Sequence, residues 1–178
     1  MTVSRLAAAG AALALALGLT ACADKPPAST PAGLATEQTT PAAQDRAEEP
    51  TLTAKAVVDA FRDAGLPVTN IAAQNEDTDP NDLLGRPGGY TSRASADVPG
   101  GDRDADKYGI DRGLVVEVFA TAEDADARSK FIQKTLKEIQ IMGTEYHYQP
   151  TDRRVLVRLT GKIKPSVAGK FEVTTTGL

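Results

Sequence analysis

The chain has 178 residues, with 20 basic and 24 acidic side chains and a formal charge of −4 at neutral pH. This acidic balance argues against nucleic-acid binding, which depends on neutralising phosphates with Lys and Arg. Its single cysteine, Cys22, excludes an intrachain disulfide and a site built on several thiolates.

The first 21 residues have the features of a secretory signal peptide. Arg5 supplies a positive charge, and residues 6–19 contain only Leu, Ala and Gly. This apolar run is too short for a membrane-spanning helix, which needs about 20 apolar residues. We therefore predict export by the general secretory route and removal of residues 1–21.

Leu19-Thr20-Ala21-Cys22, at the end of the apolar run, resembles the lipobox of bacterial lipoproteins. The resemblance implies cleavage before Cys22 and diacylglycerol on its sulfur. This lipid would anchor the chain to its expected partner, the cell membrane, on the extracytoplasmic face. An ordinary signal peptide is the alternative, because Ala21-Cys22-Ala23 also fits a small-x-small cleavage site.

Residues 22–50 are predicted to be the lipidated cysteine followed by a tether. The segment is rich in Pro, Ala and Thr and shows no apolar periodicity. A flexible coil of about 28 residues spans roughly 30 Å on average and at most about 95 Å. The globular domain is predicted over residues 51–178.

The first half of this domain is predicted to contain one helix followed by three strands. Thr53 is a helix N-cap before the apolar stripe Ala54, Val57, Val58 and Phe61, and Gly65 ends that helix. Short apolar or β-branched runs predict strands at residues 68–73, 90–98 and 112–120, with a polar loop over residues 99–110.

The second half begins with the strongest predicted helix, residues 121–139. Thr121 and Asp124 form most of a capping box. Ala127, Phe131, Thr135, Leu136 and Ile139 recur at spacings of three and four, so they are the predicted core stripe. A hairpin over residues 145–149 and 153–160 and a short helix starting at Pro165 follow.

The hairpin shows clean alternation of apolar and polar residues. Tyr146 and Tyr148 are expected on a buried face, whereas Glu145, His147 and Arg158 are expected on a solvent-facing surface. This mixture of elements predicts an α+β fold, a single domain with four to five mostly antiparallel strands and two main helices packed on one face.

Several segments resemble uncharacterised actinobacterial secreted lipoproteins: Gly65-Leu66-Pro67-Val68, Leu84 to Ser92, Glu117-Val118-Phe119 and Glu145-Tyr146. The resemblance covers most of residues 51–172. It implies a single-domain lipoprotein and carries no known activity and no assigned catalytic residue.

Arg86 and Tyr90 are the candidate residues for contact with a ligand or partner, because they lie on a glycine-flanked loop, residues 85–90. The loop lacks the Gly-Lys-Ser/Thr ending of a phosphate-binding loop. A turn into the next strand is the alternative explanation for its glycines.

Asp102, Asp104, Asp106 and Asp111 form a weak calcium candidate. The first three carboxylates have the spacing that begins a calcium loop, but Lys107 and Gly113 replace the required glycine and glutamate. A solvated acidic loop is the alternative.

Glu117 interrupts an apolar strand, which suggests a carboxylate with a raised pKa. An edge-exposed strand face or an arginine partner is the structural alternative. A hydrolase that uses Glu117 with Asp97 or Glu145 would need two carboxylates about 5–9.5 Å apart in a cleft. His147 is the one imidazole in the chain, and no serine occupies a nucleophile-elbow sequence.

The sequence therefore contains no catalytic motif and predicts no cofactor and no metal ligand set beyond the weak calcium candidate. Its best-supported function is a non-catalytic binding or interaction module of the cell envelope. The expected partners are the membrane, through Cys22, and an envelope protein or a cell-wall component. The carboxylate hydrolase is the alternative.

Overall fold

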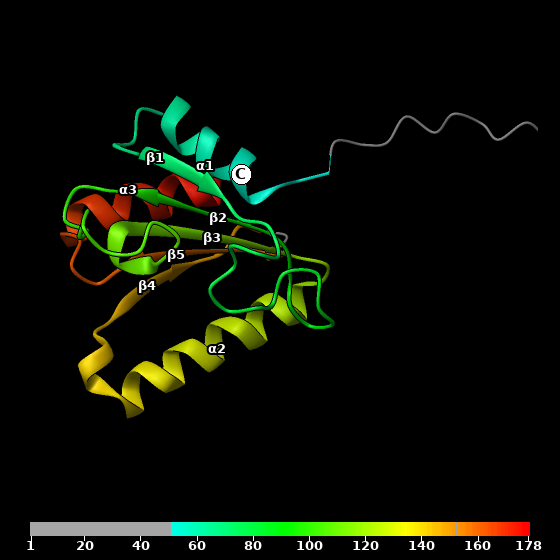
Figure 1. Cartoon of the computed structure of the whole chain (residues 1–178). Helices are drawn as coiled ribbons and strands as arrows, with labels where there is room; N and C mark the ends of the chain where they lie inside the picture. The colour runs from blue at the N-terminus through cyan, green and yellow to red at the C-terminus, as the bar shows by residue number, and fades with distance from the viewer. Residues whose placement is uncertain (1–50, 152) are drawn as a thin grey trace, which may run out of the picture. The chain divides into compact units, whose positions relative to one another are not determined.

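A five-stranded antiparallel sheet in the order β1-β2-β3-β5-β4 organises the chain in the computed structural model, which describes residues 51–151 and 153–178 (Figure 1). The predicted signal peptide, Cys22 and the predicted tether lie outside the described residues. The strands are β1 (Thr69–Ala73), β2 (Tyr90–Asp97), β3 (Gly113–Phe119), β4 (Glu145–Tyr148) and β5 (Val155–Thr160).

Three helices pack on this sheet: α1 (Ala54–Asp63), α2 (Ala122–Glu138) and α3 (Pro165–Thr176). Two short 3-10 turns, η1 (Ile110–Arg112) and η2 (Gln140–Met142), precede β3 and β4. The predicted α+β class is confirmed, with five strands. The helix predicted to start at Pro165 is present and extends to Thr176.

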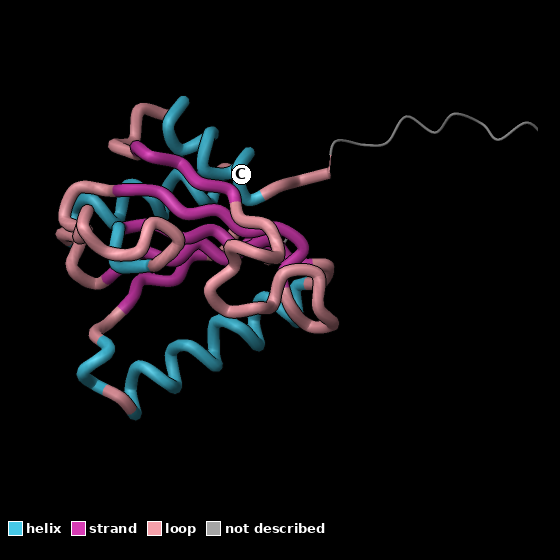
Figure 2. Tube along the Cα trace, viewed as in Figure 1, coloured by secondary structure: helices cyan, strands magenta, loops and turns pink. Residues whose placement is uncertain are grey.

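Helices cover both faces of the sheet, as Figure 2 shows. Alternate residues of β3 point to opposite faces. Leu114 and Val116 belong to the main core with α1 and α3, whereas Glu117 and Phe119 contact α2. The prediction that the two main helices pack on one face is therefore wrong: α1 shares its face with α3, and the long helix α2 lies on the other face.

The main core forms under α1 as the sequence predicts. Thr53 caps the helix by accepting a hydrogen bond from the backbone N–H of Ala56 at 3.2 Å. Val57, Val58 and Phe61 are buried, and the rings of Phe61 and Phe171 meet edge to face with centroids 5.3 Å apart. This aromatic contact joins α1 to α3 across the same face of the sheet.

Of the predicted core stripe of α2 only Leu136 is buried, so the rest of that prediction is wrong, whereas the predicted cap is confirmed. The backbone N–H of Asp124 donates to Thr121 Oγ1 at 3.1 Å. Phe131, predicted to face the core, is instead exposed. The buried apolar residues of α2 are Ala125, Ile132 and Leu136.

The polar surface that α2 covers explains its orientation. Arg128 and Ser129 lie on the side of α2 that faces the sheet, where they contact Glu117 of β3 and His147 of β4. A helix turned to bury Phe131 would withdraw Arg128 from a fully buried carboxylate, which is costly to leave unpaired. The charge pairing therefore outweighs the burial of one aromatic ring.

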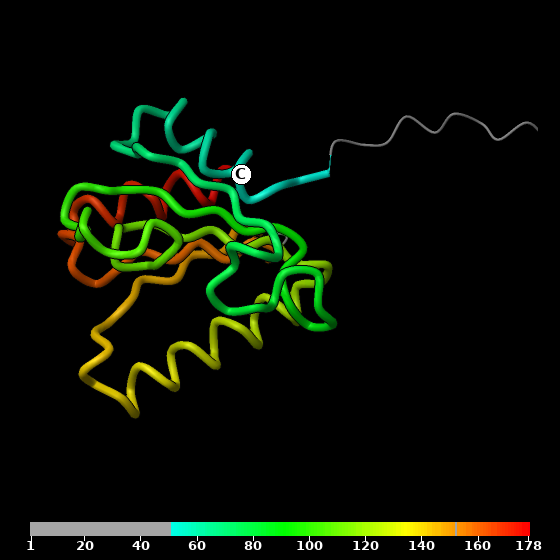
Figure 3. Tube along the Cα trace, in the orientation of Figure 1, coloured from blue at the N-terminus to red at the C-terminus, as the bar shows by residue number. Residues whose placement is uncertain are grey.

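The chain path in Figure 3 places two loops at opposite ends of α2. Residues 74–89, between β1 and β2, lie near the start of α2. The loop between β2 and β3 and the turn η2 lie toward the other end. Within residues 51–151 and 153–178, no helix combines the length and hydropathy required to cross a bilayer.

Candidate functional site

A groove of about 620 Å³ lies between α2 and the sheet, and we call it the α2 groove. Its polar side chains come from the sheet, from α2 and from the connecting loops. Its apolar side chains come mainly from α2 and η2, with Pro80 from the loop between β1 and β2 and Ile110 from η1. The residues used below are Arg93, Arg128, Glu145 and Arg158 on the polar side and Phe131, Ile141 and Met142 on the apolar side.

Glu117 lies beneath the polar side of the groove and is fully buried. Three guanidinium groups surround its carboxylate: Arg158 Nη1 at 2.9 Å, Arg128 Nε at 3.3 Å and Arg93 Nε at 3.7 Å. Burial alone would raise the pKa of Glu117, but the positive charges of these arginines outweigh burial and lower it. Glu117 therefore stays ionised.

Arg158 also forms a bidentate pair with Glu145 of the edge strand β4. Arg158 Nε lies 2.8 Å from Glu145 Oε2, and Nη2 lies 2.9 Å from Oε1. Burial opposes ionisation of Glu145, but hydrogen bonds from His147 and Arg158 lower its pKa to about 2. One arginine thus joins carboxylates from two different strands.

His147 lies under α2 and not on the solvent-facing surface that the sequence predicts. Its Nδ1 lies 2.7 Å from Ser129 Oγ, and its Nε2 lies 3.1 Å from Glu145 Oε2. Serine, histidine and glutamate therefore form a hydrogen-bonded chain that ties β4 to α2. Neither Ser129 nor His147 lines the α2 groove, and Glu145 already pairs with Arg158, so this chain of contacts positions β4.

Arg93 of β2 links the charged cluster to the loops that follow β1 and β2. Its Nη1 donates to Gln74 Oε1 and its Nη2 to the carbonyl of Tyr108, both at 3.0 Å. Its Nε lies 3.7 Å from Glu117 and has no hydrogen-bond acceptor among the residues that the structure describes. A buried N–H without an acceptor is uncommon and marks a place where an additional oxygen atom would be favourable.

The structure separates Arg86 from Tyr90, the two residues predicted to contact a ligand or partner. Tyr90 is fully buried against Phe119, its hydroxyl donates to Asp79 and accepts from Asn81, and its pKa is raised mainly by burial. Arg86 is exposed and pairs with Asp82 at 2.5 Å. Tyr90 therefore does not present its ring or hydroxyl at the surface.

The acidic loop is held by local contacts. Asp102 and Asp106 each accept a hydrogen bond from a backbone N–H two residues later, those of Asp104 and Tyr108. Asp111 pairs with Lys162 at 2.9 Å. Across residues 51–151 and 153–178, no three His, Cys, Asp or Glu side chains are grouped to hold a metal ion, so the four candidate aspartates do not converge.

Asp97 has its own partners and does not join Glu117. Arg112 binds it through Nε at 2.5 Å and Nη2 at 2.8 Å, and Asn70 donates to it at 2.7 Å. The pKa of Asp97 is lowered, chiefly by the hydrogen bonds from Arg112. Because Asp97, Glu117 and Glu145 all have lowered pKa values, none is suited to donate the proton that a carboxylate hydrolase requires.

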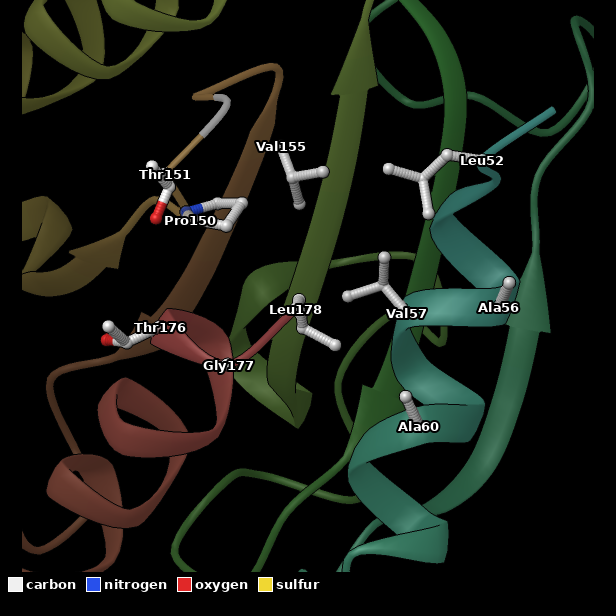
Figure 4. Close-up of a pocket in the computed structure, with 10 residues that line it drawn as sticks. All are labelled: Leu52, Ala56, Val57, Ala60, Pro150, Thr151, Val155, Thr176, Gly177 and Leu178. Carbon is white, nitrogen blue, oxygen red and sulfur yellow. The ribbon is translucent and has the colours of Figure 1, made fainter.

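A second groove of about 540 Å³ lies on the opposite face of the sheet, beside α1 (Figure 4). Leu52 and Val57 line it from the side of α1, Val155 from β5, and Leu178 from the end of the chain. None of its ten lining side chains is charged. It therefore offers apolar surface without the charged groups that converge on the α2 groove.

Sequence inspection finds Glu117, Glu145 and Arg158 and misses Arg93, Arg128 and Ser129. The missed residues become neighbours of Glu117 and His147 only when β2 and α2 pack on β3 and β4.

No protein-family model, curated protein or solved structure matches the chain.

Proposed function

We propose that the mature chain is a lipid-anchored, non-catalytic binding module on the extracytoplasmic face of the cell membrane. The proposed binding site is the α2 groove, and the proposed ligand is an envelope component that combines an anionic group with an apolar part. The observation that carries this proposal is the convergence of Arg93, Arg128 and Arg158 opposite the apolar side chains of the groove.

The guanidinium groups favour an anionic group. The two contacts of Arg128 with Glu117 measure 3.3 and 3.5 Å, longer than the roughly 2.7–2.9 Å of strong charge-assisted hydrogen bonds. Arg93 Nε lacks an acceptor among the described residues. A carboxylate or phosphate in the groove would give Arg128 a further acceptor and would be attracted by the positive charge of Arg93.

The opposite side of the groove favours an apolar part of the same ligand. Phe131, Ile141 and Met142 line the groove and are exposed to solvent. Small-molecule sites commonly combine apolar walls with a few converging polar groups that fix the orientation of the ligand. An anionic amphiphile satisfies both sides at once.

Calorimetric titration with three probes tests the groove: octyl phosphate, inorganic phosphate and 1-octanol. We expect octyl phosphate to bind the wild type at least tenfold more tightly than either other probe. Arg128→Gln should weaken octyl phosphate binding at least tenfold, since it removes one guanidinium. Lys134→Gln is the matched control, because Lys134 is an exposed cation of α2 that does not line the groove. Equal affinities for octyl phosphate and octanol, or equal losses in the two variants, would contradict the proposal.

Metabolic labelling with palmitate tests the anchor separately. Label should enter the wild-type chain and be absent from Cys22→Ser, because the sulfur is the proposed attachment atom. The wild type should sediment with membranes, since two or more acyl chains give stable attachment. Unlabelled wild-type protein released into the medium would instead indicate an ordinary signal peptide.

A further inference from the structure

We propose that the end of α2 and the turn η2 form a second membrane contact, which inserts apolar side chains into the surface of an anionic bilayer. We call this surface the α2–η2 corner. Its apolar residues are Phe131, Ile139, Ile141 and Met142, and its basic residues are Lys130, Lys134 and Lys137. The inference rests on the proposed anchor, which would hold the domain beside a membrane.

Exposed apolar side chains are concentrated at this corner. Phe131 is 62% exposed, Ile139 46%, Ile141 95% and Met142 60%. Only three other large apolar residues of the described chain are exposed: Leu52, Val173 and Leu178. Single exposed apolar residues are ordinary on protein surfaces, whereas a group of four marks an interaction surface.

The exposure of Phe131 follows from the charged contacts beneath α2. Arg128 reaches Glu117 and Ser129 reaches His147, so this side of the helix must face the sheet. Phe131, one turn after Arg128, lies at the margin of this side, where it lines the α2 groove and stays exposed to solvent. The corner therefore keeps its apolar residues exposed without requiring a change in the packing of α2.

The charges around the corner identify the partner as an anionic lipid surface. Lys130, Lys134 and Lys137 are exposed on α2. Among the described residues, Lys134 lies 3.9 Å from Glu138, and no ion pair involves Lys130 or Lys137. Lysines placed among apolar side chains are typical of helices that lie at a membrane surface. A second copy of the chain fits less well, because a two-fold contact would bring the two lysine groups together.

The proposed tether is long enough to permit this contact. The described chain begins on the right in Figure 1, and η2 lies at the lower left. A domain of about 128 residues has a diameter of roughly 36 Å. Residues 23–50 span at most about 95 Å. The corner can therefore reach the bilayer that holds Cys22.

Vesicle co-sedimentation of the mature chain with Cys22→Ser tests the corner without its lipid. We expect this protein to bind phosphatidylglycerol vesicles and to bind phosphatidylcholine vesicles at least tenfold more weakly. Adding Ile141→Asp and Met142→Asp should reduce binding to phosphatidylglycerol at least tenfold. Val173→Asp is the matched control, because Val173 is 75% exposed on α3 and lies outside the corner.

Charge variants separate this contact from the α2 groove. Lys130→Gln, Lys134→Gln and Lys137→Gln together should weaken binding to phosphatidylglycerol vesicles at least tenfold and leave octyl phosphate binding unchanged. Absence of vesicle binding by the Cys22→Ser chain, or equal losses for Val173→Asp and the two corner aspartates, would overturn the proposal. A dimer in sedimentation, lost with the corner aspartates while vesicles are not bound, would assign the corner to a second copy.

Discussion

Replacing Glu117 with alanine is expected to lower the free energy of unfolding by about 3–5 kcal/mol at neutral pH. Glu117 is fully buried, and its carboxylate is the shared acceptor of Arg128 and Arg158. Removing this carboxylate leaves the guanidinium groups without their anionic partner. Because these groups are buried, water cannot fully hydrate their charges. Urea unfolding monitored by circular dichroism would measure the loss.

Two further variants distinguish loss of charge from loss of volume. Glu117→Gln keeps the size of the side chain and one oxygen acceptor, so we expect a loss that is large but smaller than that of Glu117→Ala. Glu138→Ala removes an exposed carboxylate of α2 and should change stability by no more than about 0.5 kcal/mol. A cost below about 1 kcal/mol for Glu117→Ala would contradict the electrostatic role assigned to Glu117.

Stability alone does not account for this buried cluster. Well-packed apolar residues of similar volume often stabilise a protein as much as a buried ion pair does, or more. Among residues 51–151 and 153–178, three arginines that pair with buried carboxylates, Arg93, Arg128 and Arg158, line the α2 groove, whereas Arg112 pairs with Asp97 elsewhere. Their position supports the proposal that the cluster serves ligand binding as well as the packing of α2.

The strands and helices of this domain are predictable because their signals are local. Thr53 and Thr121 mark helix starts through their own side chains. Alternation in the hairpin places Tyr146 and Tyr148 on the main core, as the structure confirms. Such signals depend on residues a few positions apart, so they can be recognised without knowledge of the tertiary structure.

The orientation of α2 and the composition of the site depend on contacts between distant segments. The spacing of apolar residues along α2 predicts that Phe131 faces the core, because this pattern assumes that the sheet face under the helix is apolar. The face under α2 instead carries Arg93, Glu117 and Arg158, each from a different strand. The sequence signal for this polar face is the presence of charged residues inside otherwise apolar strands. These residues indicate a polar layer under α2, but they do not identify Arg128 as the residue of α2 that pairs with Glu117.

The aromatic residues Phe61 and Phe131 give the sharpest test of how the two faces differ. Phe61→Ala is expected to cost about 3–5 kcal/mol, because the ring is fully buried and packs against Phe171. Phe131→Ala is expected to change stability by no more than about 0.5 kcal/mol, since its ring is largely exposed. Urea unfolding of both variants under the same conditions would measure the difference.

The same pair of variants also discriminates between stability and membrane contact. Phe131→Ala should weaken binding to phosphatidylglycerol vesicles while the fold keeps its stability, because the ring belongs to the α2–η2 corner. A cost above about 2 kcal/mol for Phe131→Ala would mean that α2 packs with Phe131 inward. In that orientation Arg128 would turn away from Glu117, so Glu117→Ala should then cost correspondingly less. The two stability measurements therefore constrain each other, because one orientation of α2 determines both.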